Sequence, residues 1–190
     1  NIFMVISMIV IGGITRLTDS GLSMTNWHLI KGIFPPMNEL DWERLFGLYK
    51  QFPEYNLKNI NMNIDEFKKI FFWEYLHRIW GRLIGITFFI PLIYLWIKKA
   101  FNKQEKKLIY LLIALGIFQA FMGWYMVESG LVDKPDVSHF RLSIHLLTAF
   151  IIYSFLLYFF WILFSKKNQQ EISNSSTNLS YHKRNLTISL

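Results

Sequence analysis

Two histidines and one glutamate are the residues best placed to do chemistry, because they occur in long apolar segments. Ionisable side chains in such segments are costly and usually functional. Glu74 precedes His77 by three residues, so both lie on one face of a helix, and His145 lies in a separate apolar segment. With both helices running in the same direction, the two imidazoles are expected at similar depth. Two such imidazoles can bind one metal from opposite sides, and heme iron suits two axial imidazoles in an apolar bundle.

The residues around the histidines favour a flat ligand. Gly81 and Gly85 follow His77 by four and eight residues, which leaves a strip without side chains on the same helix face. A second narrow strip lies on the next apolar segment, at Gly116, Gln119 and Gly123. Close packing of two helices also produces small-residue strips, so both interpretations stay open.

Zinc is the alternative metal, with Glu74, His77 and His145 as three ligands. The glycine strips and the aromatic content of 18% favour heme. Three arginines near the outer interface are candidates to bind heme propionates, or else extend to water: Arg78, Arg82 and Arg141.

Glu74 suggests chemistry beyond electron transfer, because a carrier with two histidine ligands needs no carboxylate beside its heme. A carboxylate in apolar surroundings can accept or donate a proton, or stabilise positive charge that develops on a substrate. The structural alternative is an ion pair with Arg78 or an anchor at the interface.

Membrane-spanning helices are the elements expected to position these residues. Of the 190 residues, 53% are hydrophobic and only 17% charged, whereas soluble domains carry about 25% charge. Crossing a bilayer takes about 20 apolar residues, and the apolar segments predict an all-α, polytopic membrane protein built as a four-helix bundle. The expected helices cover residues 1–15, 70–97, 108–127 and 141–164. The first is short for a crossing, so we interpret it as a helix truncated at its N-terminal end, with a cleaved signal peptide as the alternative.

Lysine and arginine predict the orientation of the bundle. The loop 98–107 is strongly basic, and Lys166 and Lys167 follow the last helix. We therefore expect these segments on the cytoplasmic or matrix side and the long segment 16–69 outside. Since much of the net charge of +7 lies in this loop and the tail, it does not indicate a nucleic-acid partner.

Outside the bundle we expect little regular structure. Within the long loop, residues 41–49 and 63–72 have helical spacing with Asp and Asn as N-caps, which predicts short helices on the membrane surface. The polar segment 165–190 is predicted to be a disordered tail after the helical unit 1–164. The absence of cysteine excludes disulfides, cysteine metal sites and a thiol nucleophile.

Two short motifs are compatible with an internal duplication. Asp19-Ser20-Gly21-Leu22 follows the first helix, and Glu128-Ser129-Gly130-Leu131 follows the third. Each precedes an outside loop and then a helix with a histidine near its outer end. A duplicated hairpin and two independent helix ends both explain the pattern.

Several motifs resemble those of the heme A synthase family. The stretch GGITRLTDSGLSM at 12–24 is similar to the family's opening signature, and WEYLHR at 73–78 with Gly81 and Arg82 is similar to its second-helix motif. Further similar motifs are GIFPP at 32–36, PEY at 53–55, EFK at 66–68, Gln119 with GWYMV at 123–127, SGL at 129–131, and Arg141-Leu142 with His145-Leu146. They occur in order over about residues 5–160.

The resemblance implies an inner-membrane enzyme of eight helices in two similar halves. Such an enzyme oxidises the C8 methyl of heme O to a formyl group, giving heme A for cytochrome c oxidase. This chain resembles the N-terminal half, which is taken as the substrate site: His77 and His145 would ligate heme O, and Glu74 would be the catalytic carboxylate. A heme b cofactor is expected in the C-terminal half, which does not follow Phe164. The lack of cysteine is typical of the mitochondrial and proteobacterial branch.

We therefore expect the substrate half of a heme A synthase, supplied with heme O by a heme O synthase, with no electron acceptor assigned. The chain is interpreted as a fragment or a decayed gene product that does not turn over alone. The alternative functions are a cytochrome b-like electron carrier and a non-catalytic heme-binding membrane protein.

Overall fold

The predicted all-α architecture is confirmed. The computed structural model describes residues 1–24, 33–130 and 137–188, and the regular elements within these ranges are helices. They are α1 (Ile2–Leu17), α2 (Glu39–Tyr49), α3 (Pro53–Lys58), α4 (Ile64–Ile97), α5 (Lys103–Gly130) and α6 (His139–Ile188).

Three of these helices contain segments long and apolar enough to cross a membrane: Ile64–Ile97, Lys103–Glu128 and His139–Gln169. The fourth apolar helix, α1, is shorter. Large apolar side chains such as Ile90, Ile117 and Trp161 are exposed along the three long helices. Exposed apolar surface on this scale marks contact with lipid or with another apolar surface, and the chain is a polytopic membrane protein.

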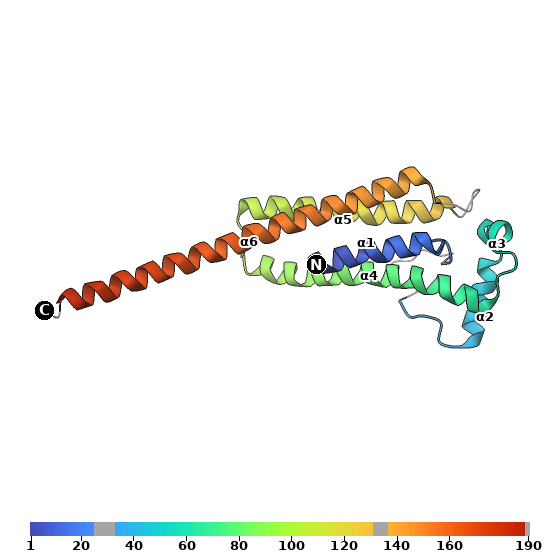
Figure 1. Ribbon diagram of the computed structural model, residues 1–190, viewed down its shortest axis with the longest axis horizontal. Coiled ribbons are helices and arrows are strands. Elements are labelled where there is room, and N and C mark those ends of the chain that lie inside the picture. The colour runs from blue at the N-terminus through green and yellow to red at the C-terminus, as the bar shows by residue number, and fades with distance from the viewer. Residues whose placement is uncertain (25–32, 131–136, 189–190) are drawn as a thin grey trace.

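The bundle consists of two antiparallel helix pairs. Helix α1 packs along α4, and α5 packs along α6 (Figure 1). The pairs meet where α1 lies against α6. Although α4 and α5 are consecutive, their closest ring contacts lie at the turn that joins them, where Trp96 packs against Phe101 and Tyr110.

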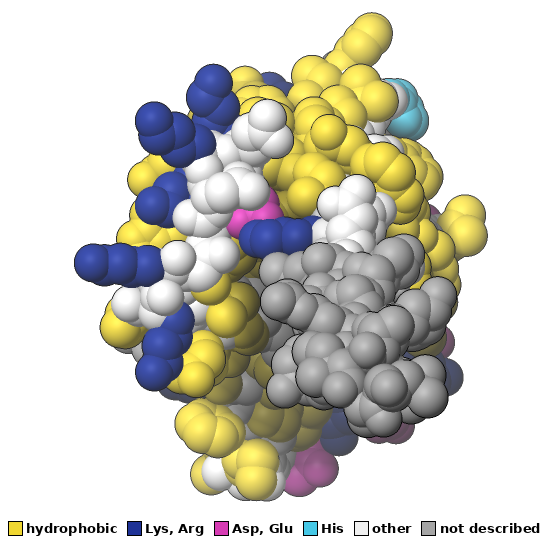
Figure 2. Space-filling model, turned by 90° about the vertical axis from the view of Figure 1, so that its left-hand side faces the viewer, with side chains coloured by type: hydrophobic (Ala, Val, Ile, Leu, Met, Phe, Trp, Pro, Cys, Tyr) yellow, Lys and Arg dark blue, Asp and Glu magenta, His cyan; other side chains and the backbone are white. Residues whose placement is uncertain are grey.

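The two ends of the bundle differ in structure and charge. One end, which we call the loop end, holds α2, α3 and the start of α4 (Figure 1). The opposite end, which we call the basic end, holds the turn between α4 and α5, and Figure 2 shows lysine and arginine side chains around it. There the buried Glu105 accepts hydrogen bonds from Lys166 Nζ at 3.1 Å and from the Asn102 backbone N–H at 2.7 Å. These bonds tie α6 to the first turn of α5.

The helix starts partly match the sequence-based expectation. Asn63 caps α4 in a capping box with Glu66, as its residue type predicts. The helix it begins is not a separate surface helix, however, because no glycine or proline lies between Asn63 and Gly81 and the helix runs on to Ile97. Helix α2 begins at Glu39 with Asn38 as its cap, earlier than the predicted start at Asp41.

Helix α6 extends much further than predicted. It continues to Ile188 through the segment 165–188, for which we predicted disorder. That segment contains no glycine or proline that would end a helix already formed by the apolar residues before it. Figure 1 shows this part as a single helix that projects beyond the bundle.

An aromatic cluster joins α2 to the start of α4. We call the two short helices at the loop end, α2 and α3, the cap. Phe67 is 0% exposed, and its ring centroid lies 5.1 Å from those of Phe46 and Tyr49. Trp42 meets Phe67 edge-on at 6.4 Å. Rings packed this way are favourable beyond the apolar area they bury, so the cluster fixes the cap on α4.

We predict that Phe67→Ala lowers the free energy of unfolding by about 3–5 kcal/mol, because it leaves a cavity inside this cluster. The matched control is Phe72→Ala on the same helix, since Phe72 is 53% exposed and should change stability by about 0.5 kcal/mol or less. Denaturant unfolding in detergent micelles measures both. Equal losses for the two variants would contradict the assigned role of the cluster.

Candidate functional site

The two predicted ligand histidines lie on different helix pairs. His77 is on α4 and His145 is on α6, and both side chains are partly buried. The imidazoles are close enough to interact electrostatically. Each ring has a buried Nδ1 atom with no hydrogen-bond partner among the described residues. The structure therefore brings the two rings near each other from opposite pairs, as a two-histidine metal site requires.

A glycine on a neighbouring helix faces each histidine ring. A Cβ atom built on Gly12 of α1 would lie 3.1 Å from Cε1 of His77, and one built on Gly123 of α5 would lie 3.4 Å from Cε1 of His145. The sequence strip containing Gly123 therefore does face the site. Gly12, in contrast, comes from a helix to which we had assigned no site residue.

The side-chain amide of Gln119 also faces the site. It lies 3.2 Å from Nε2 of His145, and its Oε1 atom is buried without a hydrogen-bond partner in the described ranges. Buried polar atoms are almost always hydrogen-bonded. The unpartnered atoms of Gln119, His77 and His145 therefore fit a site that binds a ligand with a metal ion and polar groups.

The glycine strip on α4 serves two purposes. A Cβ on Gly81 would touch the Met8 methyl group at 3.4 Å, so Gly81 lies in the contact between α1 and α4. A Cβ on Gly85, or on Gly116 of α5, would meet no atom within 4 Å. Close helix packing thus explains Gly81, whereas the space beside Gly85 and Gly116 is open.

Glu74 forms a buried clamp on the segment that follows α1. It is 3% exposed and accepts hydrogen bonds from Ser23 Oγ and from the Met24 backbone N–H, both at 2.7 Å. Arg78 pairs with the other carboxylate oxygen and donates to the Met24 carbonyl at 2.9 Å. The ion pair that we considered as the structural role of Glu74 is therefore present.

The zinc alternative lacks its ligand set. Within the described part of the chain, no three His, Cys, Asp or Glu side chains come together to hold a metal ion. Glu74 instead faces Ser23, Met24 and Arg78. Heme iron, which needs only the two imidazoles, is the metal centre that these residues fit.

The three arginines have different surroundings. Arg78 is engaged with Glu74, and Arg82 follows one turn later on α4, close enough for the two guanidinium groups to repel each other. The Arg141 guanidinium lies 4.1 Å from the centre of the Tyr125 ring, a cation–π contact between α6 and α5. All three belong to α4 or α6, the helices that hold the histidines.

A second buried carboxyl group lies in the cap, on α3. Glu54 is 3% exposed and shares a hydrogen bond with the Tyr49 hydroxyl, which also accepts one from Asn59 Nδ2 at 2.7 Å. Burial raises the pKa of Glu54 to about 7, and the negative charge of Glu74 adds to the shift. Burial likewise raises the pKa of Tyr49 above its ordinary value. Glu54 is therefore a carboxyl that changes charge near neutral pH.

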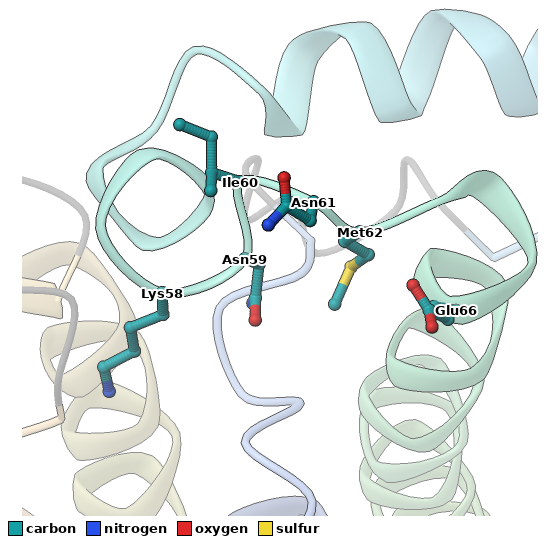
Figure 3. Close-up of a pocket in the computed structure, with 6 residues that line it drawn as sticks. All are labelled: Lys58, Asn59, Ile60, Asn61, Met62 and Glu66. Atoms are coloured by element: carbon teal, nitrogen blue, oxygen red, sulfur yellow. The ribbon is translucent and has the colours of Figure 1, made fainter.

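The cap also has a surface pocket, shown in Figure 3, whose lining includes neither His77 nor His145. It lies between α3 and the start of α4 and is lined by Lys58, Asn59, Ile60, Asn61, Met62 and Glu66. The Glu66 carboxylate in this pocket belongs to the α4 capping box. The pocket is thus a feature of the connection between two helices.

Comparison with known proteins identifies the family of this chain. The family of cytochrome oxidase assembly proteins described as COX15-CtaA matches residues 1–188. The chain belongs to the COX15-CtaA family. No solved structure matches the chain significantly.

Curated relatives of this COX15-CtaA chain carry the name heme A synthase. One from Flavobacterium psychrophilum is 52% identical over 158 residues, which is 82% of this chain and 47% of the relative. One from Flavobacterium johnsoniae is 51% identical over 153 residues, covering 80% and 45%. One from Rhodospirillum centenum is 48% identical over 154 residues, covering 81% and 41%. The chain therefore spans about half the length of the curated relatives it matches.

The site includes residues that residue type and spacing did not single out. Gly12, Ser23 and Met24 lie in the stretch that resembles the opening signature of heme A synthase, and Glu54 lies in the PEY motif. Only that resemblance marked them. The contacts of Gly12, Ser23 and Met24 join segments far apart in the chain, which helical spacing does not reveal, whereas Glu54 bonds to Tyr49 nearby.

We predict that stability falls as pH rises through the titration of Glu54. The folded chain keeps a proton on Glu54 up to about pH 7, whereas the unfolded chain loses it near pH 4.5. Rising pH therefore favours the unfolded chain between these values. Glu54→Gln, which stays neutral, should be more stable than the unmodified chain by about 3 kcal/mol at pH 8 and nearly equal at pH 4.5.

Unfolding in detergent at a series of pH values measures this difference. The control is Glu43→Gln, because Glu43 is exposed on α2. A constant difference between Glu54→Gln and the unmodified chain at every pH would contradict the assignment to Glu54.

Proposed function

We propose that this chain forms the heme O-binding half of a heme A synthase, with His77 and His145 as the two axial ligands of the heme iron. The observation that carries the proposal is that α4 and α6, from different helix pairs, bring these two imidazoles together with unpartnered Nδ1 atoms. The name shared by the curated relatives supports the same function. In this reading the reaction is oxidation of the C8 methyl group of heme O to the formyl group of heme A.

Bound heme supplies a redox-active iron and a large flat macrocycle; the chain's own residues hold and orient it. The open space beside Gly85 and Gly116 suits the faces of the macrocycle. Gln119 is proposed to approach the macrocycle beside His145, because its amide already reaches Nε2 of that ring. Arg82 and Arg141 are the leading candidates for the propionates, with Arg78 as a further one although it is engaged by Glu74. We propose that heme b is held by the corresponding half of the full-length protein.

Glu74 is proposed to act as a fixed negative charge one helical turn from His77. Its hydrogen bonds to Ser23, Met24 and Arg78 hold the carboxylate in one place. Oriented charge of this kind stabilises positive charge that develops on a substrate, without reorganisation during the reaction. The clamp favours this role over proton shuttling, which would require the carboxylate to exchange partners.

The setting in the cell follows from the same proposal. The basic end of the bundle is proposed to face the cytoplasm or matrix at the inner membrane, since short basic loops stay on that side. The loop end and the heme then lie toward the other surface. A heme O synthase in the same membrane is the proposed source of the substrate.

A second candidate function is a heme-binding protein that does no chemistry on the porphyrin, such as a cytochrome b-like electron carrier. The observation that favours it is again the clamp, because Ser23, Met24 and Arg78 already engage both oxygens of the Glu74 carboxylate. Under this alternative Glu74 only secures the segment after α1. The two candidates share the heme ligands and differ in what loss of the Glu74 charge does.

We predict that the chain, placed in lipid nanodiscs, binds ferric heme b as a probe with the low-spin absorption spectrum of two histidine ligands. His77→Ala and His145→Ala should each abolish that spectrum, because each removes one axial ligand. His139→Ala is the matched control, since His139 is exposed at the start of α6. An unchanged spectrum in either of the first two variants would rule out the proposed ligand pair.

Catalysis is tested in a chimera in which residues 1–164 replace the matching half of the Flavobacterium psychrophilum heme A synthase. We predict that the chimera converts heme O to heme A and that Glu74→Gln keeps heme but lowers heme A formation by about 100-fold or more, as loss of one oriented charge does. Glu43→Gln is the control. Chromatography of extracted hemes measures the products.

Two results of the chimera experiment would overturn the proposal in different ways. Heme A formed by Glu74→Gln at the unmodified rate would remove the charge role. A chimera that binds heme and makes no heme A would favour the non-catalytic candidate.

A further inference from the structure

We propose that Gly12 and Gly123 are positioning residues that fix the planes of the two ligand imidazoles. Each leaves free, beside the ring edge of one histidine, the space that a side chain on the neighbouring helix would fill. The inference rests on the proposed function in one respect only, namely that His77 and His145 bind heme iron. Under this proposal, α1 determines the orientation of the His77 imidazole plane and α5 determines that of His145.

The space between Gly12 and His77 is tighter than an added side chain normally needs. A Cβ there would lie 3.1 Å from Cε1 and 3.5 Å from Nδ1 of His77. Carbon atoms in contact normally lie about 3.5–4.0 Å apart, so an added methyl group would push the ring. Nδ1 and Cε1 both move when the imidazole turns about its bond to Cβ, and Nδ1 moves further. A side chain at position 12 would therefore displace the ring, whereas glycine leaves room for the present orientation of its plane.

The space between Gly123 and His145 is of the same kind but wider. A Cβ there would lie 3.4 Å from Cε1 of His145, which is ordinary van der Waals contact. Gln119, one turn earlier on α5, reaches Nε2 of the same ring at 3.2 Å. Helix α5 thus faces His145 at two ring atoms: the Gln119 amide lies at Nε2, and the space left by the missing side chain of Gly123 lies at Cε1.

These contacts are not a general property of the glycines in this chain. Among the other described glycines, Gly81 would meet only the Met8 methyl group, and the rest would meet no atom within 4 Å: Gly13, Gly21, Gly47, Gly85 and Gly116. Only Gly12 and Gly123, among these described glycines, are positions where an added Cβ would meet a ring of the two predicted ligands. They lie in equivalent places, because α1 is the packing partner of α4 and α5 is the packing partner of α6.

The arrangement has a chemical consequence. The angle between two axial imidazole planes changes how their orbitals mix with those of ferric iron, and low-spin electron paramagnetic resonance g-values report that angle. The protein can set an iron centre through ligand orientation and surrounding structure as well as through ligand identity. Glycines that hold the rings would therefore set the spectrum and the redox potential.

The test uses the whole chain in nanodiscs with ferric heme b as the probe, and compares Gly12→Ala with Gly13→Ala. Gly13 is the matched control, because it is adjacent on α1 and its Cβ would meet nothing within 4 Å. Gly12→Ala should shift the low-spin g-values and the midpoint potential, and weaken heme binding by about tenfold or more through overpacking. Gly13→Ala should leave all three measurements unchanged.

Gly123→Ala serves as the second variant, because its wider contact can accept a methyl group after a small movement. It should retain heme and shift the g-values less than Gly12→Ala does. If Gly12→Ala fails to fold, the test rests on Gly123→Ala, and shifted low-spin g-values in that variant support the proposal. Heme-loaded Gly12→Ala or Gly123→Ala with unmodified g-values would overturn the role of that glycine.

Failure of the positioning role is distinguishable from failure of the heme site itself. If the unmodified chain shows no two-histidine spectrum, or keeps it in His77→Ala, the proposed ligand pair is wrong. If that spectrum is present and depends on both histidines while the glycine variants leave it unchanged, only the positioning role is wrong.

Discussion

The buried Glu74 carboxylate is the interaction on which the geometry of the site depends. A buried charge is costly unless hydrogen bonds and an opposite charge surround it, and here Ser23, Met24 and Arg78 meet that need. Because Ser23 and Met24 follow α1 while Arg78 lies on α4, the clamp fixes the end of α1 relative to α4. The position of α1 along α4 determines which residue of α1 faces His77, and that residue is Gly12.

The division into two helix pairs gives the site its second constraint. In each pair a glycine faces the histidine of the partner helix, and the pairs meet through α1 and α6. Neither pair contains both ligands, so a bound heme would join the two halves of the bundle. This construction also suits the duplication that the motifs near Asp19 and Glu128 suggest, although Leu131 lies outside the described residues and the duplication stays a prediction.

Local patterns in the sequence predicted which helices form better than they predicted where each helix begins and ends. Apolar runs predicted the long helices, and Asn63 predicted the start of α4, because helix propensity and capping act over a few residues. The same reasoning missed α3, which starts at Pro53, and ended α6 too early, because polar residues without glycine or proline do not stop a helix. Spacing paired Glu74 with Arg78 but not with Ser23, a contact made only when the chain folds.

The central claim is that one heme lies between the two helix pairs and is ligated by one histidine from each. The most direct measurement is an experimentally determined structure of the chain in nanodiscs with heme bound. The account predicts a single macrocycle beside Gly85 and Gly116, with one iron bonded to His77 and His145. Heme bound elsewhere, or ligated by only one of these histidines, would contradict it.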